Sequence, residues 1–223
     1  MLLGPPGSGK GTLAELLEER LAIAHVSTGE LFRREVERGT GLGRRVSRYV
    51  LEGQLVPDDV VVAVMTRELQ RRSLTRGVVL DGFPRTVGQA QGLDRLLMRR
   101  KQPLDGALYL TCRPSVLVAR LSGRRVCSRC GANYHVQTMP STRQGFCDRC
   151  GGRLVIRKDD RVATIKQRLV IDRAKARPLV AYYRRKGLLH RLDGNGSIDK
   201  VFQQALRLFG RQGWLEDDRV KNS

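Results

Sequence analysis

The amino-acid sequence predicts an α/β protein built on a doubly wound parallel sheet. Short apolar runs alternate along the chain with stretches long enough to form crossover helices. A glycine-rich turn follows the first run and opens a segment with helical periodicity. This alternation is typical of parallel sheets whose two faces are both covered by helices. We expect strands at residues 1–3, 23–26, 78–80, 107–110 and 188–192.

Two segments interrupt the alternation and read as small insertions on a central body. The first, residues 27–56, has helical character but few bulky apolar residues. The second, residues 123–160, is rich in Gly, Cys and Arg and has no long apolar face.

The helix that follows the glycine-rich turn carries its leucines on one face. These are Leu13, Leu16, Leu17 and Leu21.

Length, composition and charge limit the class of protein. The chain has 223 residues, of which 40% are hydrophobic, enough for one well-buried core. No apolar run reaches the roughly 18 residues that a membrane span needs, and no signal peptide precedes the first strand. We therefore exclude membrane-spanning and secreted proteins and expect a cytoplasmic location. The net charge of +20 makes nucleic acids and nucleotide phosphates plausible polyanionic partners.

The turn after the first strand has the pattern of a phosphate-binding loop, Gly4-Pro5-Pro6-Gly7-Ser8-Gly9-Lys10-Gly11-Thr12. Glycines let successive backbone N–H groups face an anion, and the following helix adds a positive partial charge. Lys10 is expected to reach the outer phosphates. The hydroxyl that usually follows the lysine comes one residue later, at Thr12. An ordinary Gly-Pro turn is the alternative, and the strand-turn-helix context disfavours it.

Four of the five cysteines form two C-x2-C pairs, each followed by glycine and separated by sixteen residues. This spacing matches a tetrahedral zinc site made of four thiolates. Such a site leaves no position for water, so the zinc is expected to be structural and to replace a missing core. The alternative is four free thiols on a loop. The predicted ligands are Cys127, Cys130, Cys147 and Cys150.

Several further motifs resemble those of adenylate kinases, in the same order along residues 1–209. They are Ser27-Thr28-Gly29-Glu30, Gly53-Gln54-Leu55-Val56-Pro57-Asp58, Val78-Val79-Leu80-Asp81-Gly82-Phe83-Pro84-Arg85 with Gln89, Gly123-Arg124-Arg125 and Arg157-Lys158-Asp159-Asp160. The four-cysteine insertion resembles the zinc-bearing lid of the bacterial long form.

The resemblance implies the P-loop nucleoside monophosphate kinase fold, with five parallel strands flanked by helices. It also implies three parts: a core of residues 1–26, 57–122 and 161–223, an NMP-binding domain at 27–56, and a zinc-binding lid at 123–160. The implied enzyme is a monomeric ATP:AMP phosphotransferase. It reversibly moves the γ-phosphoryl group of ATP to AMP with Mg²⁺, giving two ADP, and serves adenine nucleotide homeostasis.

By the same resemblance, specific residues take roles in catalysis and binding. The catalytic set is Lys10, Asp81, Arg85, Arg120, Arg124, Arg157 and Arg168. The ATP-binding set is Gly7, Ser8, Gly9, Lys10, Gly11, Thr12, Arg120, Arg124, Asn133, Tyr134 and Gly196. The AMP-binding set is Thr28, Gly29, Arg33, Gln54, Leu55, Val56, Gly82, Phe83, Pro84, Arg85, Gln89, Arg157 and Arg168.

For two residues of these sets the sequence leaves a structural interpretation open. Asp81 is expected to orient Mg²⁺ through its water shell, and a turn or helix-capping role is the alternative. Gln89 is expected to contact the adenine of AMP, and an ordinary position on a helix surface is the alternative.

Two other functions remain open at this point. Residues 161–191 contain ten Lys or Arg and one acid, Asp172, a balance of 10 − 1 = +9. A zinc ribbon beside such a basic helix is also typical of a nucleic-acid-binding protein, which here would carry a vestigial nucleotide site. The low aromatic content, 5%, counts against binding of single strands. The second alternative is a kinase for another nucleoside monophosphate.

Overall fold

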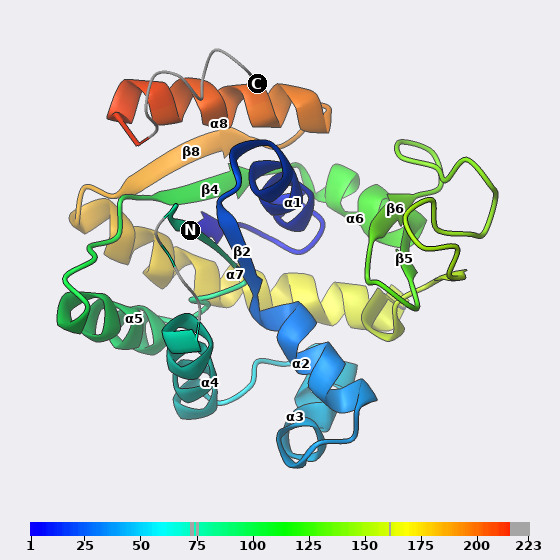
Figure 1. Ribbon diagram of the computed structural model, residues 1–223, viewed down its shortest axis with the longest axis horizontal. Helices are drawn as coiled ribbons and strands as arrows, with labels where there is room; N and C mark the ends of the chain where they lie inside the picture. Colours follow the sequence, from blue (N-terminus) through cyan, green and yellow to red (C-terminus); the bar gives the residue numbers. More distant parts are fainter. Residues whose placement is uncertain (72–73, 75, 161, 215–223) are drawn as a thin grey trace.

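A five-stranded sheet forms the centre of the computed structural model, which describes residues 1–71, 74, 76–160 and 162–214. The strand order is β2-β3-β1-β4-β8, and every neighbouring pair is parallel (Figure 1). Each strand overlaps one of the predicted runs, and its ends differ from that run by at most one residue. The strands are β1 (Leu2–Leu3), β2 (Ala24–Ser27), β3 (Val78–Asp81), β4 (Ala107–Thr111) and β8 (Leu189–Asp193).

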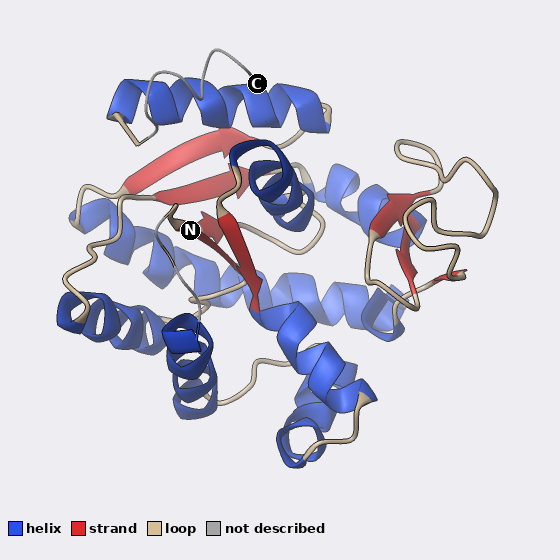
Figure 2. Cartoon of the chain, in the orientation of Figure 1, coloured by secondary structure: helices blue, strands red, loops and turns tan. Residues whose placement is uncertain are grey.

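Helices cover both faces of the sheet, as the sequence predicts (Figure 2). Leu2 and Leu3 of β1 belong to opposite apolar clusters because successive side chains of a strand point to opposite faces. The Leu2 cluster includes apolar residues of α1 (Lys10–Leu21) and α8 (Ile198–Gln212). The Leu3 cluster includes those of α4 (Asp58–Arg71), α5 (Val87–Arg99) and α7 (Val162–Arg185). The carboxyl ends of the strands are thereby held in a rigid frame.

The first insertion is a pair of short helices, α2 (Thr28–Glu37) and α3 (Gly41–Glu52), which pack against each other. Ser27 and Thr40 cap their N-termini, since each side-chain oxygen accepts a hydrogen bond from a backbone N–H of the first turn. Only glycine fits at Gly43, where a Cβ would lie 2.0 Å from the carbonyl oxygen of Glu35. The close packing of the two helices depends on this missing side chain.

The second insertion follows α6 (Pro114–Gly123) and forms a three-stranded antiparallel sheet in the order β6-β5-β7. Its strands are β5 (Arg124–Cys127), β6 (Asn133–His135) and β7 (Leu154–Val155). The apolar cluster under it contains only four buried residues, two of them cysteines. A short 3-10 helix, Lys158–Asp160, then leads the chain into α7.

Helix α7 has 24 residues and crosses the whole molecule behind the sheet (Figure 1). Leu179 and Tyr183 anchor it in the core, where both side chains are buried. Its other side is solvent-exposed and includes Pro178. Within the described ranges, no helix combines the length and the apolar character that crossing a bilayer requires.

Candidate active site

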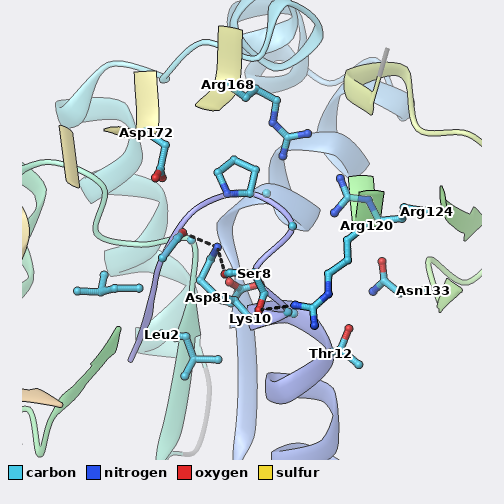
Figure 3. A pocket seen from close by; sticks show the side chains of 18 of the residues that line it. Leu2, Ser8, Lys10, Thr12, Asp81, Arg120, Arg124, Asn133, Arg168 and Asp172 are labelled. Carbon is cyan, nitrogen blue, oxygen red and sulfur yellow. Dashed lines mark hydrogen bonds between the residues drawn. The ribbon is translucent and has the colours of Figure 1, made fainter. Parts of the chain in front are cut away.

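A cavity of about 920 Å³ opens at the carboxyl ends of the central strands. Its walls come from the glycine-rich loop, the start of α2, the loop after β3, the second insertion, α7 and the loop after β8. Ligands of open parallel sheets bind at this edge, because the strand-to-helix loops meet there. Figure 3 shows side chains from distant parts of the sequence pointing into this space.

The glycine-rich loop turns tightly between β1 and α1. Gly7 and Gly9 have φ angles of +82° and +95°, which side chains with a Cβ rarely adopt. The backbone N–H of Ser8 donates to the carbonyl oxygen of Pro5 at 3.1 Å and closes the turn. Gly9 caps α1 without any side-chain hydrogen bond, so the first N–H groups of the helix remain available to an anion.

Lys10 lies in the middle of the loop (Figure 3). Its Nζ donates hydrogen bonds to the carbonyl oxygens of Gly4 at 2.6 Å and Pro5 at 2.9 Å. Burial lowers the pKa of Lys10, and the carboxylates of Asp81 and Asp172 oppose that shift. The ammonium group is therefore a poorly hydrated cation beside the loop's N–H groups, where a phosphate would be attracted most strongly.

Asp81 ends β3 beside Lys10, and its Oδ2 lies 3.9 Å from Nε2 of His25. Burial alone would raise the pKa of Asp81, but the nearby imidazole of His25 and the charge of Lys10 outweigh burial and lower it. Asp81 is thus an ionised carboxylate within the cavity lining. Carboxylate oxygens with space for water are the ligands that Mg²⁺ prefers, so this residue fits a magnesium ion that arrives with a nucleotide.

Six arginines line the same cavity: Arg33, Arg85, Arg120, Arg124, Arg157 and Arg168. They come from six different segments, and several are held in place by backbone carbonyls. Arg120 donates to the carbonyl oxygens of Gly194 at 2.7 Å and Gly196 at 2.8 Å. Burial lowers the pKa of Arg33 to about 9, with a further contribution from the nearby charge of Arg157. It stays charged at neutral pH, so the cavity is strongly electropositive.

Two carboxylates organise three of these arginines. Arg157 forms a two-pronged contact with Asp159, at 2.7 and 3.0 Å. Asp160 accepts from both Arg124 and Arg168, the latter at 2.9 Å. Burial would raise the pKa of Asp159, but the charges of Arg157 and Arg168 hold it well below its usual range. Both aspartates belong to the Arg157-Lys158-Asp159-Asp160 motif, but their roles in holding these arginines were not predicted.

Most of the predicted site residues border this cavity. All members of the ATP-binding set line it, as do the catalytic residues. Eight members of the AMP-binding set also line it: Gly29, Arg33, Leu55, Gly82, Pro84, Arg85, Arg157 and Arg168. The remaining members of that set are absent from its walls: Thr28, Gln54, Val56, Phe83 and Gln89.

Gln89 lies beneath the cavity wall, where it is only 2% exposed. Its side-chain oxygen accepts from the backbone N–H of Arg85 at 2.8 Å, and its amide nitrogen donates to Asp58 at 2.9 Å. The alternative of an ordinary helix-surface residue is therefore wrong. Thr28 is also buried and donates to the carbonyl oxygen of Gly82 at 2.9 Å. In this structure both side chains support the loop that carries Arg85.

The four predicted zinc ligands meet in the second insertion, with all four Sγ atoms within 4.8 Å of one another. Tetrahedral zinc with Zn–S bonds of about 2.3 Å requires Sγ atoms about 3.8 Å apart. The Sγ atoms of Cys127 and Cys150 are 3.4 Å apart, and those of Cys130 and Cys147 are 3.6 Å apart. The donor set and its spacing fit a closed zinc site.

Groups around two of the four cysteines, Cys127 and Cys147, also favour thiolates. Backbone N–H groups of Arg129 and Cys130 point at Cys127 Sγ, at 3.4 and 3.5 Å. The hydroxyl of Tyr134 donates to Cys147 Sγ at 3.4 Å and lowers the pKa of that thiol to about 6. Such outer hydrogen bonds orient the ligands of a metal and stabilise their charge.

Comparison with known proteins gives the family. A family model described as "Adenylate kinase" matches residues 2–188. The chain belongs to the adenylate kinase family. Relatives named "Adenylate kinase" include one from Moorella thermoacetica, 46% identical over 95% of this chain and 97% of its own length. Another, from Clostridium beijerinckii, is 43% identical over 94% of this chain and 97% of its own length.

Two contacts between the second insertion and α1 were not predicted. Asn133 of β6 donates to the carboxylate of Glu15 on α1, and Arg149 pairs with Glu19 one turn further along. Burial raises the pKa of Glu15, and the hydrogen bond from Asn133 opposes the shift. The i, i+4 spacing of the two glutamates places them on one helix face, but their partners are more than 110 residues away.

Proposed function

We propose that this chain catalyses the reversible transfer of the γ-phosphoryl group of ATP to AMP, giving two ADP. One observation carries the proposal: Lys10 of the phosphate loop and six arginines from separate segments converge on a single cavity. A site for one nucleotide needs fewer cations than this. Membership in the adenylate kinase family supports the same reaction.

The cavity divides into a donor side and an acceptor side in this proposal. ATP would bind along the phosphate loop and under the lid, at Gly7, Ser8, Gly9, Lys10, Gly11, Thr12, Arg120, Arg124, Asn133, Tyr134 and Gly196. AMP would bind at Gly29, Arg33, Leu55, Gly82, Pro84 and Arg85, with Thr28, Gln54, Val56, Phe83 and Gln89 around them. Arg157 and Arg168 would lie between the two phosphate chains.

Catalysis would rest on positioning and charge neutralisation, since phosphoryl transfer asks little covalent chemistry of the protein. Lys10 and the arginines would oppose the charge that builds up on the transferring group. Mg²⁺ bound to ATP would neutralise further phosphate charge, and Asp81 would hold its water shell. The lid would exclude water, which prevents hydrolysis of ATP.

The molecular organisation forms part of the proposal. The core would comprise residues 1–26, 57–122 and 161–223, of which 72–73, 75, 161 and 215–223 lie outside the described residues. Residues 27–56 would form the NMP-binding domain and 123–160 the lid, with one structural zinc on its four cysteines. We also propose a cytoplasmic monomer whose net charge of +20 attracts polyanions.

Arg85 provides the test of the acceptor site. Its Nε donates to the carbonyl oxygen of Gly82 at 2.9 Å, which orients the guanidinium within the cavity wall. Arg85→Lys keeps the charge but loses two-pronged phosphate binding, so kcat/KM for AMP should fall at least ~100-fold, or about 2.7 kcal/mol. Arg34→Lys, at an exposed position of α2, is the matched control.

A coupled assay of ADP formation from ATP with AMP, GMP, CMP or UMP measures both variants and the base preference. We expect AMP to be the best acceptor and Arg34→Lys to match the wild type. A loss for ATP alone in Arg85→Lys would contradict the acceptor site, and preference for another monophosphate would assign a different kinase. The alternative of a vestigial nucleotide site predicts no turnover with any of the four.

A further inference from the structure

The side of α7 that faces away from the cavity carries a row of four cations. Lys166, Arg173, Arg177 and Arg184 are exposed and follow one another at intervals of seven, four and seven residues. At about 100° per residue, these four positions fall within about 40° of one another around the helix. The first and last members of the row are 18 residues apart in sequence, or about 27 Å along the helix at 1.5 Å per residue.

The row is free to meet an external partner. None of the four side chains forms an ion pair or hydrogen bond with another residue of the described part of the chain. Lys186, by contrast, is exposed but paired with Asp94 of α5. The single acid of α7, Asp172, lies on the opposite side and lines the cavity. The row therefore presents uncompensated positive charge.

The residues around this row of cations indicate which kind of polyanion it can bind. Membrane-surface helices carry a broad apolar face with Leu, Phe or Trp. Among the α7 residues whose side chains the structure describes, Val170 is the only large hydrophobic one that is markedly exposed. Single-stranded nucleic acids need aromatic platforms, but Tyr183 is buried and the hydroxyl of Tyr182 donates to Asp94. Long cationic side chains in a row along one helix suit the regularly spaced phosphates of a duplex.

We propose that the outer face of α7 binds the phosphate backbone of double-stranded nucleic acid without sequence preference. The binding is independent of the kinase reaction, since the row and the cavity occupy opposite sides of the helix. Four phosphate contacts predict a slope of log K against log salt of about −3.6, or roughly a 150-fold loss between 50 and 200 mM salt. Such binding would tether the enzyme reversibly to nucleic acid.

The test compares two variants of equal net charge. Arg173→Gln/Arg177→Gln/Arg184→Gln removes three cations from the row, and Lys200→Gln/Arg207→Gln/Arg211→Gln removes three exposed cations from α8. Fluorescence anisotropy with labelled 24-base-pair DNA and RNA duplexes, in saturating ADP to occupy the cavity, measures affinity at several salt concentrations. Arg173→Lys/Arg177→Lys/Arg184→Lys keeps the charges and serves as the rescue variant.

In the α7 glutamine variant, we expect the slope of log K against log salt to become about 2.7 less negative. In the α8 variant and the α7 lysine variant, the slope should stay close to that of the wild type. All three should keep kinase turnover and thermal stability, which separates this proposal from the proposed function. Equal losses in the α7 and α8 variants would show attraction by net charge alone and overturn the proposal. So would absence of duplex binding at low salt, or tighter binding to phosphatidylserine vesicles or to a single strand.

Discussion

The Nζ of Lys10 binds the carbonyl oxygens of its own loop and thereby holds that loop in a shape that fits an anion. The cost of burying the ammonium group is met by these contacts and by the nearby carboxylate of Asp81. When a phosphate enters, Nζ can exchange a neutral carbonyl for a charged oxygen, a stronger hydrogen bond. The same side chain thus shapes the unliganded loop and, in the proposed reaction, would bind a phosphate.

Replacing Lys10 tests this dual role. Lys10→Met should cut turnover by about two to three orders of magnitude, because it removes a contact to charge that develops in the transition state. Steady-state kinetics in both directions measure the loss, and thermal unfolding monitors the fold. Lys101→Met, at an exposed position, is the control and should behave as the wild type. Wild-type turnover in Lys10→Met would contradict its placement on the phosphates.

Asp159 makes the arginine cluster sensitive to acid. Its pKa is held well below the usual range in the folded protein, so it stabilises the fold above the unfolded pKa of about 3.9. That stabilisation is lost as pH falls below about 4 toward the folded pKa. Asp159→Asn should lower the free energy of unfolding by roughly 3–5 kcal/mol at pH 7, because buried guanidinium groups lose their partner.

Urea denaturation at several pH values checks this prediction. The difference between wild type and Asp159→Asn should be constant from pH 7 to about pH 5 and shrink at lower pH. Asp59→Asn, which changes an exposed carboxylate of α4, should differ from the wild type by less than about 1 kcal/mol throughout. A difference for Asp159→Asn that grows as pH falls would contradict the sign of the linkage.

For single residues, the sequence predicts which ones lie near the site but not which hydrogen bonds their side chains form. Gln89 lies four residues from Arg85, and that spacing correctly brings it to the same loop. Its amide instead bonds to Asp58, 31 residues away in sequence, because a buried amide must satisfy its donors. This hydrogen bond depends on how α4 and α5 pack against each other, and no local sequence pattern predicts that packing.

At the level of secondary-structure elements, α1 contacts the second insertion through Glu15 and Glu19. The Arg149–Glu19 pair is about half exposed on both sides and contributes little, whereas Glu15 is more deeply buried. The hydrogen bond from Asn133 to Glu15 is therefore the stronger link. Because α1 begins at the phosphate loop, this link joins lid position to the donor site.

Removing the Glu15 carboxylate, which accepts the hydrogen bond from Asn133, tests that link. Glu15→Ala should raise KM for ATP about 10-fold, since the closed lid loses a hydrogen bond to a charged group worth about 1.5 kcal/mol. KM for AMP should change less than about 2-fold. Glu15→Gln keeps an oxygen that accepts from Asn133 and should restore KM for ATP. Equal rises in both KM values would instead indicate a general disturbance of α1.

The strands of the main sheet could be predicted because their hydrophobic pattern is regular. All five strands of the main sheet lie within one residue of the predicted runs, because buried parallel strands read as continuous apolar segments. The strands of the second insertion had no such signal. Leu154–Val155 is only two residues long, and Arg124–Cys127 begins with two charged residues. Turns set by the cysteine pairs shape this sheet more than apolar alternation does.

In the whole molecule, two well-packed faces of the main sheet contrast with a lid that has almost no core. Its buried cluster consists of Cys127, Ala132, Tyr134 and Cys147. So few apolar contacts cannot offset the entropy of ordering residues 123–160. The strand alternation predicted the first part of this architecture, and the paired cysteines predicted that a metal takes the place of a core in the second.

Loss of the metal should therefore loosen the lid before the rest of the molecule. Cys147→Ser/Cys150→Ser should bind less zinc and unfold at a lower temperature, because metal affinity contributes directly to folding of this segment. Turnover at low temperature should persist, since Lys10 and the arginines of the core do not depend on the cysteines. Metal analysis, calorimetry and kinetics on the same samples measure the three effects.

Cys112→Ser is the matched control, because that thiol lies outside the four-cysteine cluster. It should keep both its zinc content and its melting temperature. In the double variant, hydrogen exchange should rise first in residues 123–160, while α1 and α8 keep their protection. Complete loss of phosphoryl transfer in a double variant that is still folded would contradict a purely structural metal.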